Sequence, residues 1–469
     1  MRVRVQVIVE TDNDIPPTVH EVARVERSDL RIDTLGLHLA EAKDLLQHVQ
    51  DVVIAEQARQ ALAEQVACPV CGRARRHKDA ATIVLRTLFG MLRLRSPRWW
   101  HCPCTPQPTR TFSPLAALLP ERNTPELLYL ESKFAGLVSY GQSASLLAET
   151  LPLGRPLHAT AVRLHAQATA EKLEQDLGPE QSMFIEGCQA EWDELPRPDL
   201  PLTVGLDGAY VHSSQQRSRK DGWFEVIAGK RMSTDGPAKC FGFVPTYDSM
   251  PKRRLFDVLR SQGMQPNQQV TFLTDGGEDV RELSLYLNPQ CEHWLDWFHI
   301  TIRLTVLNQM AKGVRSRESP RLIDDLTDEL ERLKWYLWHG NVFLALQTIT
   351  FAQLDIDSVE MSPEERKLSK AIAEFGGYIR ANAAWIPNYG ERFRAGEAIS
   401  SAFVESTVNQ VVSKRMVKQQ QMRWTPRGAH LLLQVRTRVL NDELSDVFQR
   451  WYPGFIAASV GIAETELAA

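Results

Sequence analysis

The chain has 469 residues, of which 43% are hydrophobic and 24% are charged, and its formal net charge is −4 at pH 7. This length exceeds what one hydrophobic core usually organises and predicts two to four domains. No stretch approaches the ~18 consecutive apolar residues of a membrane span, and residues 1–10 lack the apolar block of a signal peptide. These features argue against a membrane-spanning or secreted protein and predict a cytoplasmic one.

The small net charge hides two basic segments. From Cys68 to Arg110, many Lys and Arg residues stand against the single acid Asp79. A second segment follows Glu405, and its phosphate-binding candidates are Lys414, Arg415, Lys418 and Arg423. Such patches are the electrostatic footprint of nucleic-acid binding, and ordinary solvated surface charge is the alternative.

The first 66 residues are expected to form an N-terminal strand and a long helix. Strict alternation predicts a strand at residues 2–10, and an apolar stripe predicts an amphipathic helix at 35–65. Such a stripe is typical of a core or a subunit contact.

Residues 67–112 predict a zinc-ribbon-like segment. Two cysteine pairs flank two β-rich runs around Gly90: Cys68, Cys71, Cys102 and Cys104. A hairpin that brings the pairs together supplies the four thiolates of a tetrahedral, structural Zn²⁺ site. His77 and His101 are possible substitute ligands, and uncoordinated thiols are the alternative.

Residues 113–190 predict a helical, DNA-binding region. Amphipathic stretches at 127–137 and 143–149, a Pro/Gly break and a helix at 158–173 fit a helix-turn-helix. Its candidate DNA-reading side chains are Thr160, Arg163 and His165. An ordinary helical hairpin is the alternative.

Residues 200–315 carry a pattern of three strands followed by alternating helices and strands. The strands are predicted at 202–206, 224–228, 240–244, 270–273 and 293–297, and the helices at 253–262, 278–287 and 299–312. This order predicts a multidomain α/β protein with an RNase H-like core. An all-α insertion follows at 316–395, and residues 396–469 hold a last core helix and a basic C-terminal region.

Three acids stand at matching places in this layout. Asp207 and Asp275 are each predicted to end a strand, the two strands are expected to be neighbours, and Glu405 lies on a later helix. Mg²⁺ or Mn²⁺ ions that promote phosphodiester chemistry need such convergent hard oxygen ligands. A plain turn is the alternative at each Asp-Gly pair.

Asp296 competes with Asp275 for the second catalytic place. It too follows a short strand, and His299 lies three residues later. We interpret Asp296 and His299 as groups that orient a metal ligand or contact the scissile phosphate, with a satisfied core histidine as the alternative.

The motifs around these residues resemble those of bacterial DDE-class insertion-sequence transposases of the ISKra group, and more distantly those of Mutator-like transposases. They are Val-Gly-Leu-Asp207-Gly, Leu-Thr-Asp275-Gly-Gly, His-Trp-Leu-Asp296-Trp-Phe-His299 and Phe-Val-Glu405-Ser-Thr-Val-Asn409. The resemblance spans residues 65–440. It implies a metal-binding triad, an accessory Asp-x-x-His motif and a helical insertion before the third acid.

The resemblance also implies a function. The chain would bind the terminal inverted repeats of its element, in double-stranded DNA, and catalyse metal-dependent strand cleavage and strand transfer as a homodimer or larger assembly. Asn409, one turn after Glu405, is expected to contact DNA or a metal-bound water, whereas Val412 stands where some families place a phosphate-binding base. A catalytically inactive DNA-binding protein and a non-mobile nuclease are the alternatives.

Overall fold

The computed structural model describes residues 1–10, 16–104, 110–178, 190, 194–196, 202–214, 222–231, 238–265, 267–277, 283, 291–314, 320–357, 362–400, 402–417 and 423–456. The chain divides into two compact units: Met1–Thr169 with Asp442–Ala469, and Ala170–Asn441. Among the described helices, none has both the length and the apolar character needed to cross a membrane.

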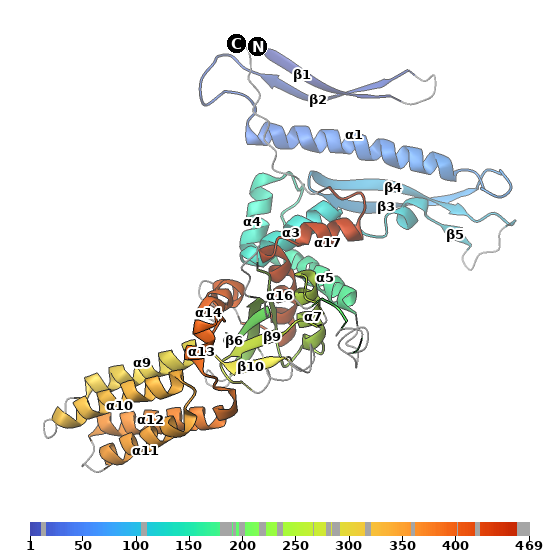
Figure 1. Cartoon of the computed structure of the whole chain (residues 1–469). Coiled ribbons are helices and arrows are strands. Elements are labelled where there is room, and N and C mark those ends of the chain that lie inside the picture. Colours follow the sequence, from blue (N-terminus) through green and yellow to red (C-terminus); the bar gives the residue numbers. More distant parts are fainter. Residues whose placement is uncertain are drawn as a thin grey trace. The chain divides into compact units, whose positions relative to one another are not determined.

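The first unit contains a two-stranded sheet, a three-stranded sheet and several helices (Figure 1). Its elements are β1 (Arg2–Val9), β2 (Thr18–Glu26), α1 (Leu39–Gln65), β3 (His77–Thr87), β4 (Gly90–Trp100), β5 (Thr111–Phe112), α2 (Pro114–Leu118), α3 (Pro125–Leu137), α4 (Tyr140–Thr150), the first part of α5 (Ala159–Leu177) and α17 (Leu444–Trp451).

The β3–β4 hairpin is amphipathic because side chains alternate across a strand. Ile83, Leu92 and Leu94 are buried on one face, where Ile54 and Leu62 of α1 pack against them. The predicted long helix is therefore present, and its C-terminal half covers this sheet. The opposite face of the hairpin is free to carry charge.

The second unit is built on a five-stranded sheet (Figure 1). Its strands and covering helices are β6 (Leu202–His212), β7 (Trp223–Arg231), β8 (Cys240–Phe243), α7 (Pro251–Ser261), β9 (Val270–Thr274), β10 (Glu292–Leu295), α14 (Ala402–Val408), a π-helix (Asn409–Ser413), α15 (Lys414–Met416) and α16 (Pro426–Leu440).

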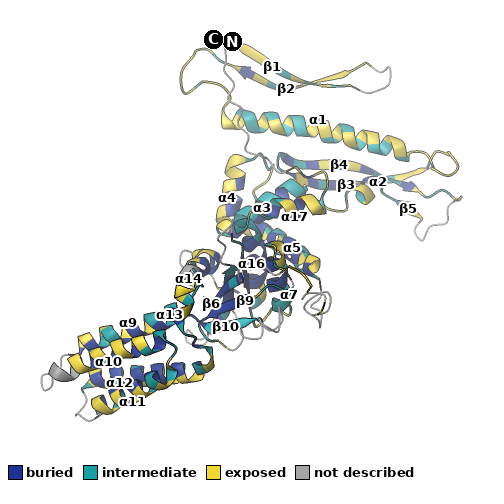
Figure 2. Ribbon diagram, in the orientation of Figure 1, coloured by how far each residue is buried: buried dark blue, intermediate teal, exposed yellow. Residues whose placement is uncertain are grey.

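The strand order of this sheet is β10-β9-β6-β7-β8. The pairs β6–β7 and β7–β8 are antiparallel, whereas β6–β9 and β9–β10 are parallel. The predicted three-strand meander is thus present. The side chains of the central strands are largely buried (Figure 2), and Leu206, Phe272 and Leu255 of α7 belong to one buried apolar cluster. The helix predicted at 278–287 lies outside the described residues except for residue 283.

A helical bundle with its own core extends from the sheet. It comprises α9 (Trp297–Gly313), α10 (Pro320–Trp338), α11 (Val342–Asp357), α12 (Pro363–Ala381), a short 3₁₀ helix (Ala383–Trp385) and α13 (Tyr389–Arg394). Ile300 and Leu304 of α9 belong to the same buried cluster as Leu333 and Phe375. The bundle therefore begins at α9, directly after β10, and not at residue 316.

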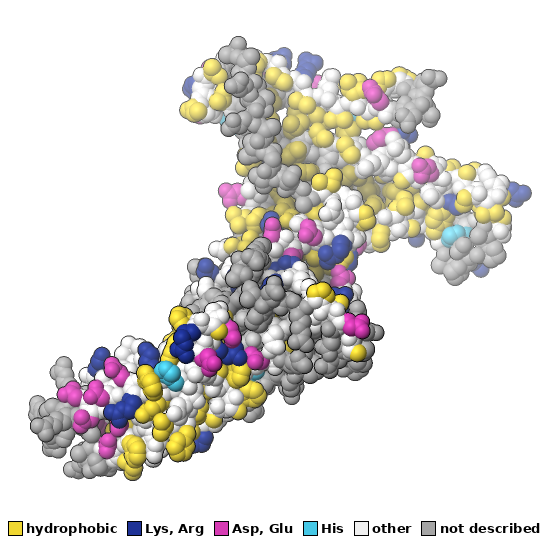
Figure 3. Space-filling model, viewed as in Figure 1, with side chains coloured by type: hydrophobic (Ala, Val, Ile, Leu, Met, Phe, Trp, Pro, Cys, Tyr) yellow, Lys and Arg dark blue, Asp and Glu magenta, His cyan; other side chains and the backbone are white. Residues whose placement is uncertain are grey.

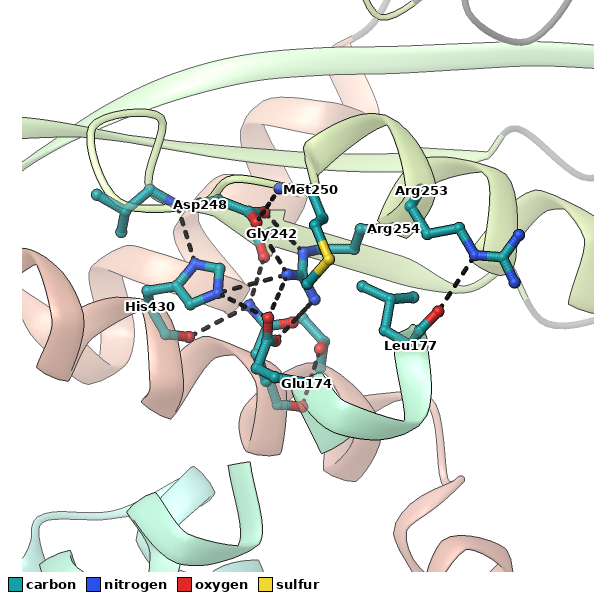
Figure 4. Close-up of polar contacts among 11 residues, drawn as sticks. Glu174, Leu177, Gly242, Asp248, Met250, Arg253, Arg254 and His430 are labelled. Carbon is teal, nitrogen blue, oxygen red and sulfur yellow. Dashed lines mark hydrogen bonds and ion pairs between the residues drawn. The ribbon is translucent and has the colours of Figure 1, made fainter. Parts of the chain in front are cut away.

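A buried ion cluster fastens α7 and α16 to the second part of α5 (Figure 4). The Arg254 guanidinium, on α7, donates hydrogen bonds of 2.9 Å to Asp248 and to Glu174, and one of 2.7 Å to Gln434. His430 Nε2 lies 3.5 Å from Glu174. Burial disfavours the Glu174 carboxylate, but the His430 hydrogen bond and the Arg254 charge outweigh it and lower its pKa to about 2.

We predict that Glu174→Gln destabilises the protein by about 2 kcal/mol at pH 7, because it leaves the buried Arg254 charge incompletely paired. The folded-state pKa of Glu174 lies below its ordinary value, so its contribution is complete above about pH 4.5 and is lost as the pH falls towards 2. Urea unfolding between pH 7 and pH 3 measures this. Glu171→Gln is the control, because Glu171 pairs with Arg427 on the surface and should cost under about 0.5 kcal/mol. Equal losses in the two variants would contradict the assignment.

Candidate active site and metal centre

The four clustered cysteines form one compact group of thiols at the base of the β3–β4 hairpin. Their Sγ atoms all lie within 4.8 Å of one another, with 3.5 Å between Cys68 and Cys104 and 3.4 Å between Cys71 and Cys102. Tetrahedral zinc with Zn–S bonds of about 2.3 Å separates its sulfurs by about 3.8 Å. This group could therefore hold a metal ion such as zinc. The substitute ligand His101 instead stacks on Phe112, with 4.7 Å between ring centroids.

The backbone around the first cysteine pair favours thiolates. Amide groups of Cys71 and Val70 hydrogen-bond to the Cys68 sulfur and lower the pKa of Cys68 to about 6. The Cys104 amide likewise lowers the pKa of Cys102. Zinc binds thiolates, so this local geometry prepares the site for the metal near neutral pH.

Asp207 lies in the middle of β6. The prediction that it ends the strand is wrong, because β6 continues to His212 in antiparallel pairing with β7. The parallel pairing of β6 with β9 stops at Gly205 opposite Leu273. Asp207 and Asp275 each stand two residues beyond that pair, so they lie beside each other where the parallel pairing of the two strands ends. The prediction that these two strands are neighbours is confirmed.

Asp296 and His299 join these two acids from the start of α9. The Asp296 amide donates to Thr274 O over 2.9 Å, and its buried side chain accepts from Phe298 N as the N-cap of α9. His299 Nε2 lies 3.7 Å from Asp296 Oδ2 and 4.0 Å from Asp207 Oδ1. The structure therefore brings the accessory pair and Asp207 together.

The carboxylates of Asp207, Asp275 and Asp296 form a cluster, called the acidic edge below, in which like charges repel one another. Burial raises the pKa of Asp207, and the charges of Asp275 and Asp296 raise it further, while His299 and the Gly208 amide oppose the change. Additional positive charge at this edge would favour the ionised form of Asp207.

The turn after β9 is held by residues of the helical bundle that sequence reasoning did not single out. The Tyr378 hydroxyl donates to Asp275 O over 3.0 Å. Gly276 has a φ of +96°, and a Cβ there would lie 2.5 Å from Asn382 Oδ1, so only glycine fits. Tyr389 supports the next strand by donating to Leu295 O over 2.7 Å. These partners lie about a hundred residues away in the chain, and no local pattern marks them.

Glu405 is exposed on α14, which packs against β6 and β7. Its helix thus contacts the strand that carries Asp207, but no described interaction joins the Glu405 carboxylate to the acidic edge. Asn409 begins the π-helix that follows. Such widened turns recur at functional sites.

The helical region places its three predicted DNA-reading residues differently. Thr160 and Arg163 are exposed on α5. His165 instead hydrogen-bonds to the buried Glu131 of α3 and lies 3.4 Å from Asn123. In this conformation His165 links two helices and is not available to read a base.

The predicted phosphate-binding residues after Glu405 also differ in their exposure to solvent. Lys414 and Arg423 are exposed, whereas Lys418 lies outside the described residues. Arg415 has no exposed area and sits 5.4 Å from the Trp424 ring centroid. The prediction that Arg415 binds phosphate is therefore wrong for this conformation, because the side chain is part of the core.

Glu174, Asp248 and His430 form a second group whose ligand-type atoms lie within 4.8 Å of one another. The Arg254 guanidinium already lies among them and compensates their charge. This group is therefore explained without a metal ion, although its donor atoms are of the kinds that metals bind.

No protein-family model matches the chain, and no curated protein is detectably similar to it.

We predict that the purified protein contains one zinc ion per chain, and that Cys71→Ser and Cys102→Ser variants lose it, because three thiolates bind zinc less tightly than four. Elemental analysis by mass spectrometry measures this. Cys291→Ser is the control, since Cys291 stands outside the group and its loss should leave the zinc in place. A wild-type protein without zinc after metal-free purification and zinc addition would contradict the assignment.

Proposed function

We propose that the protein is a DNA transposase whose five-stranded sheet is an RNase H-like catalytic core. The observation that carries this proposal is the convergence of Asp207, Asp275 and Asp296 at one edge of the sheet, where β9 runs parallel to both β6 and β10. An antiparallel meander followed by two parallel strands is the strand arrangement expected of such a core.

The acidic edge fits a divalent metal. Its donors are carboxylate oxygens, the ligands that Mg²⁺ and Mn²⁺ prefer. Burial, and then the charges of Asp275 and Asp296, raise the pKa of Asp207. Bound there, Mg²⁺ or Mn²⁺ would favour hydroxyl attack on a phosphodiester and stabilise the leaving oxygen. Asp207 and Asp275 would hold the metal, and Glu405 would complete the set from α14.

Asp296 and His299 have a different role in this proposal. Asp296 is fixed by its N-cap hydrogen bond and by its own amide, so it holds its carboxylate beside His299. The histidine then faces Asp207 from the start of α9. This pair would orient Asp207 or donate to a phosphate oxygen, as outer ligand partners do.

DNA binding is proposed for the first unit and for exposed bases near α14. Arg86, Arg93 and Arg95 are exposed on the β3–β4 hairpin, on the face opposite the apolar side chains that pack on α1. With Thr160 and Arg163 of α5, they offer a phosphate-binding surface. Recognition of terminal inverted repeats in double-stranded DNA, by a homodimer or larger assembly, belongs to the same proposal.

We predict that the protein cleaves DNA carrying the segments that flank its coding sequence when Mg²⁺ or Mn²⁺ is present, and that Asp207→Asn lowers the rate at least ~100-fold because it removes a metal-binding charge. Gel analysis of labelled duplexes measures cleavage, and a target plasmid reports strand transfer. Asp257→Asn is the control, because Asp257 pairs with Arg438 away from the acidic edge.

Three outcomes separate the candidate functions. Cleavage with strand transfer supports a transposase, whereas cleavage without transfer would indicate a non-mobile nuclease. Metal-independent binding with no cleavage, or equal cleavage by wild type and Asp207→Asn, would overturn the enzymatic proposal in favour of a DNA-binding protein.

A further inference from the structure

Arg303 borders the acidic edge from the side of α9. It lies four residues after His299, and side chains at this spacing share one face of a helix. His299 points along that face to Asp207 and Asp296. Arg303 therefore projects from the same face one turn further along, and its side chain is exposed.

Tyr378 of α12 connects Arg303 with Asp275. The guanidinium carbon of Arg303 lies 4.1 Å from the centroid of the Tyr378 ring, and the hydroxyl of the same ring donates to Asp275 O over 3.0 Å. The ring face of Tyr378 thus supports the Arg303 guanidinium, and its hydroxyl supports the turn that contains Asp275.

Arg303 has no carboxylate within ion-pair distance among the residues that the structure describes. Arg392 of α13, by contrast, pairs with Glu292 and Glu397. The visible surface of the bundle carries both signs of charge interspersed (Figure 3). Arg303 also donates a hydrogen bond to the Tyr378 hydroxyl. A guanidinium has five N–H donors, so this exposed side chain retains donors for an anion such as phosphate.

We propose, on the basis of the function proposed above, that Arg303 binds a backbone phosphate of the DNA next to the cleaved bond. Tyr378 is a positioning residue that holds both this guanidinium and Asp275. Without metal, the negative charge of the acidic edge repels the DNA backbone. The Arg303 guanidinium places a positive charge next to that edge. The ligand is therefore a nucleic-acid phosphate, contacted without reading the base.

The test for Arg303 is binding of a fluorescein-labelled duplex by anisotropy at increasing salt, with no Mg²⁺ or Mn²⁺ added, so that cleavage does not interfere. Arg303→Ala should lower the slope of log affinity against log salt by about one, because one phosphate contact is lost. Lys312→Ala is the matched control: Lys312 is exposed on α9 and lies about 13 Å further along the helix axis. Identical slopes for Arg303→Ala and wild type would overturn the proposal.

Arg303→Lys is the control for misfolding of Arg303→Ala, because lysine keeps the positive charge and the aliphatic part of the side chain. It should retain the salt slope of the wild type but cleave DNA about tenfold more slowly, because a point charge replaces the planar fork that positions the phosphate. Cleavage at the wild-type rate by both Arg303 variants would count against a role next to the cleaved bond.

The test for Tyr378 is Tyr378→Phe, which keeps the ring beneath Arg303 and removes the hydroxyl that contacts both Arg303 and Asp275 O. DNA affinity should fall less than in Arg303→Ala, because the ring still supports the guanidinium, while the Mn²⁺ concentration for half-maximal cleavage rises about tenfold, as for other groups that orient metal ligands. Mn²⁺ binding to the DNA-free protein, followed by electron paramagnetic resonance, should weaken in parallel. A lower melting temperature with unchanged Mn²⁺ binding would reduce Tyr378 to a structural residue and overturn its assignment.

These results also separate the two proposals. If the wild type neither binds the duplex nor cleaves DNA, the proposed function and this inference fail together. If the wild type is active and the Arg303 and Tyr378 variants behave as it does, only this inference fails.

Discussion

The gathering of like charges at one edge of the five-stranded sheet is the constraint on which the second unit depends. The parallel register of β6 with β9 sets Asp207 beside Asp275, and β10 adds Asp296 from the other side of β9. Burial and this repulsion together raise the pKa of Asp207. Such repulsion destabilises the fold unless other contacts offset it, and groups with perturbed pKa values cluster at functional sites.

Those contacts come largely from the helical bundle. Tyr378 holds the turn after β9, where the Asn382 side chain lies close to Gly276, and Tyr389 holds the end of β10. The bundle has its own apolar core, so it presents these side chains from a rigid support. The bundle therefore supports the acidic edge and is more than an insertion between Asp275 and Glu405.

The sequence was sufficient to predict the elements whose signals are local. Short apolar runs separated by turn-rich segments located the meander, and cysteine spacing located the thiol group. Burial and long-range partners had no local signal. Arg415 was predicted to bind phosphate at the surface, but it lies over the Trp424 ring in the core. His165 was predicted to read DNA, but it is hydrogen-bonded to Glu131. The length of β6 was underestimated because Asp-Gly is typical of a turn, whereas pairing with β7 carries the strand through it.

The most direct test of the account is anomalous diffraction from crystals of the protein grown with Mn²⁺ and duplex DNA. An anomalous peak is expected at the acidic edge, within coordination distance of Asp207 and Asp275, with the Glu405 carboxylate brought to it. A peak held by Asp207, Asp296 and His299 without Asp275 would reverse the assignment of the second acid. The absence of Mn²⁺ from this edge in DNA-bound crystals would contradict the central claim that these carboxylates form a metal-dependent active site.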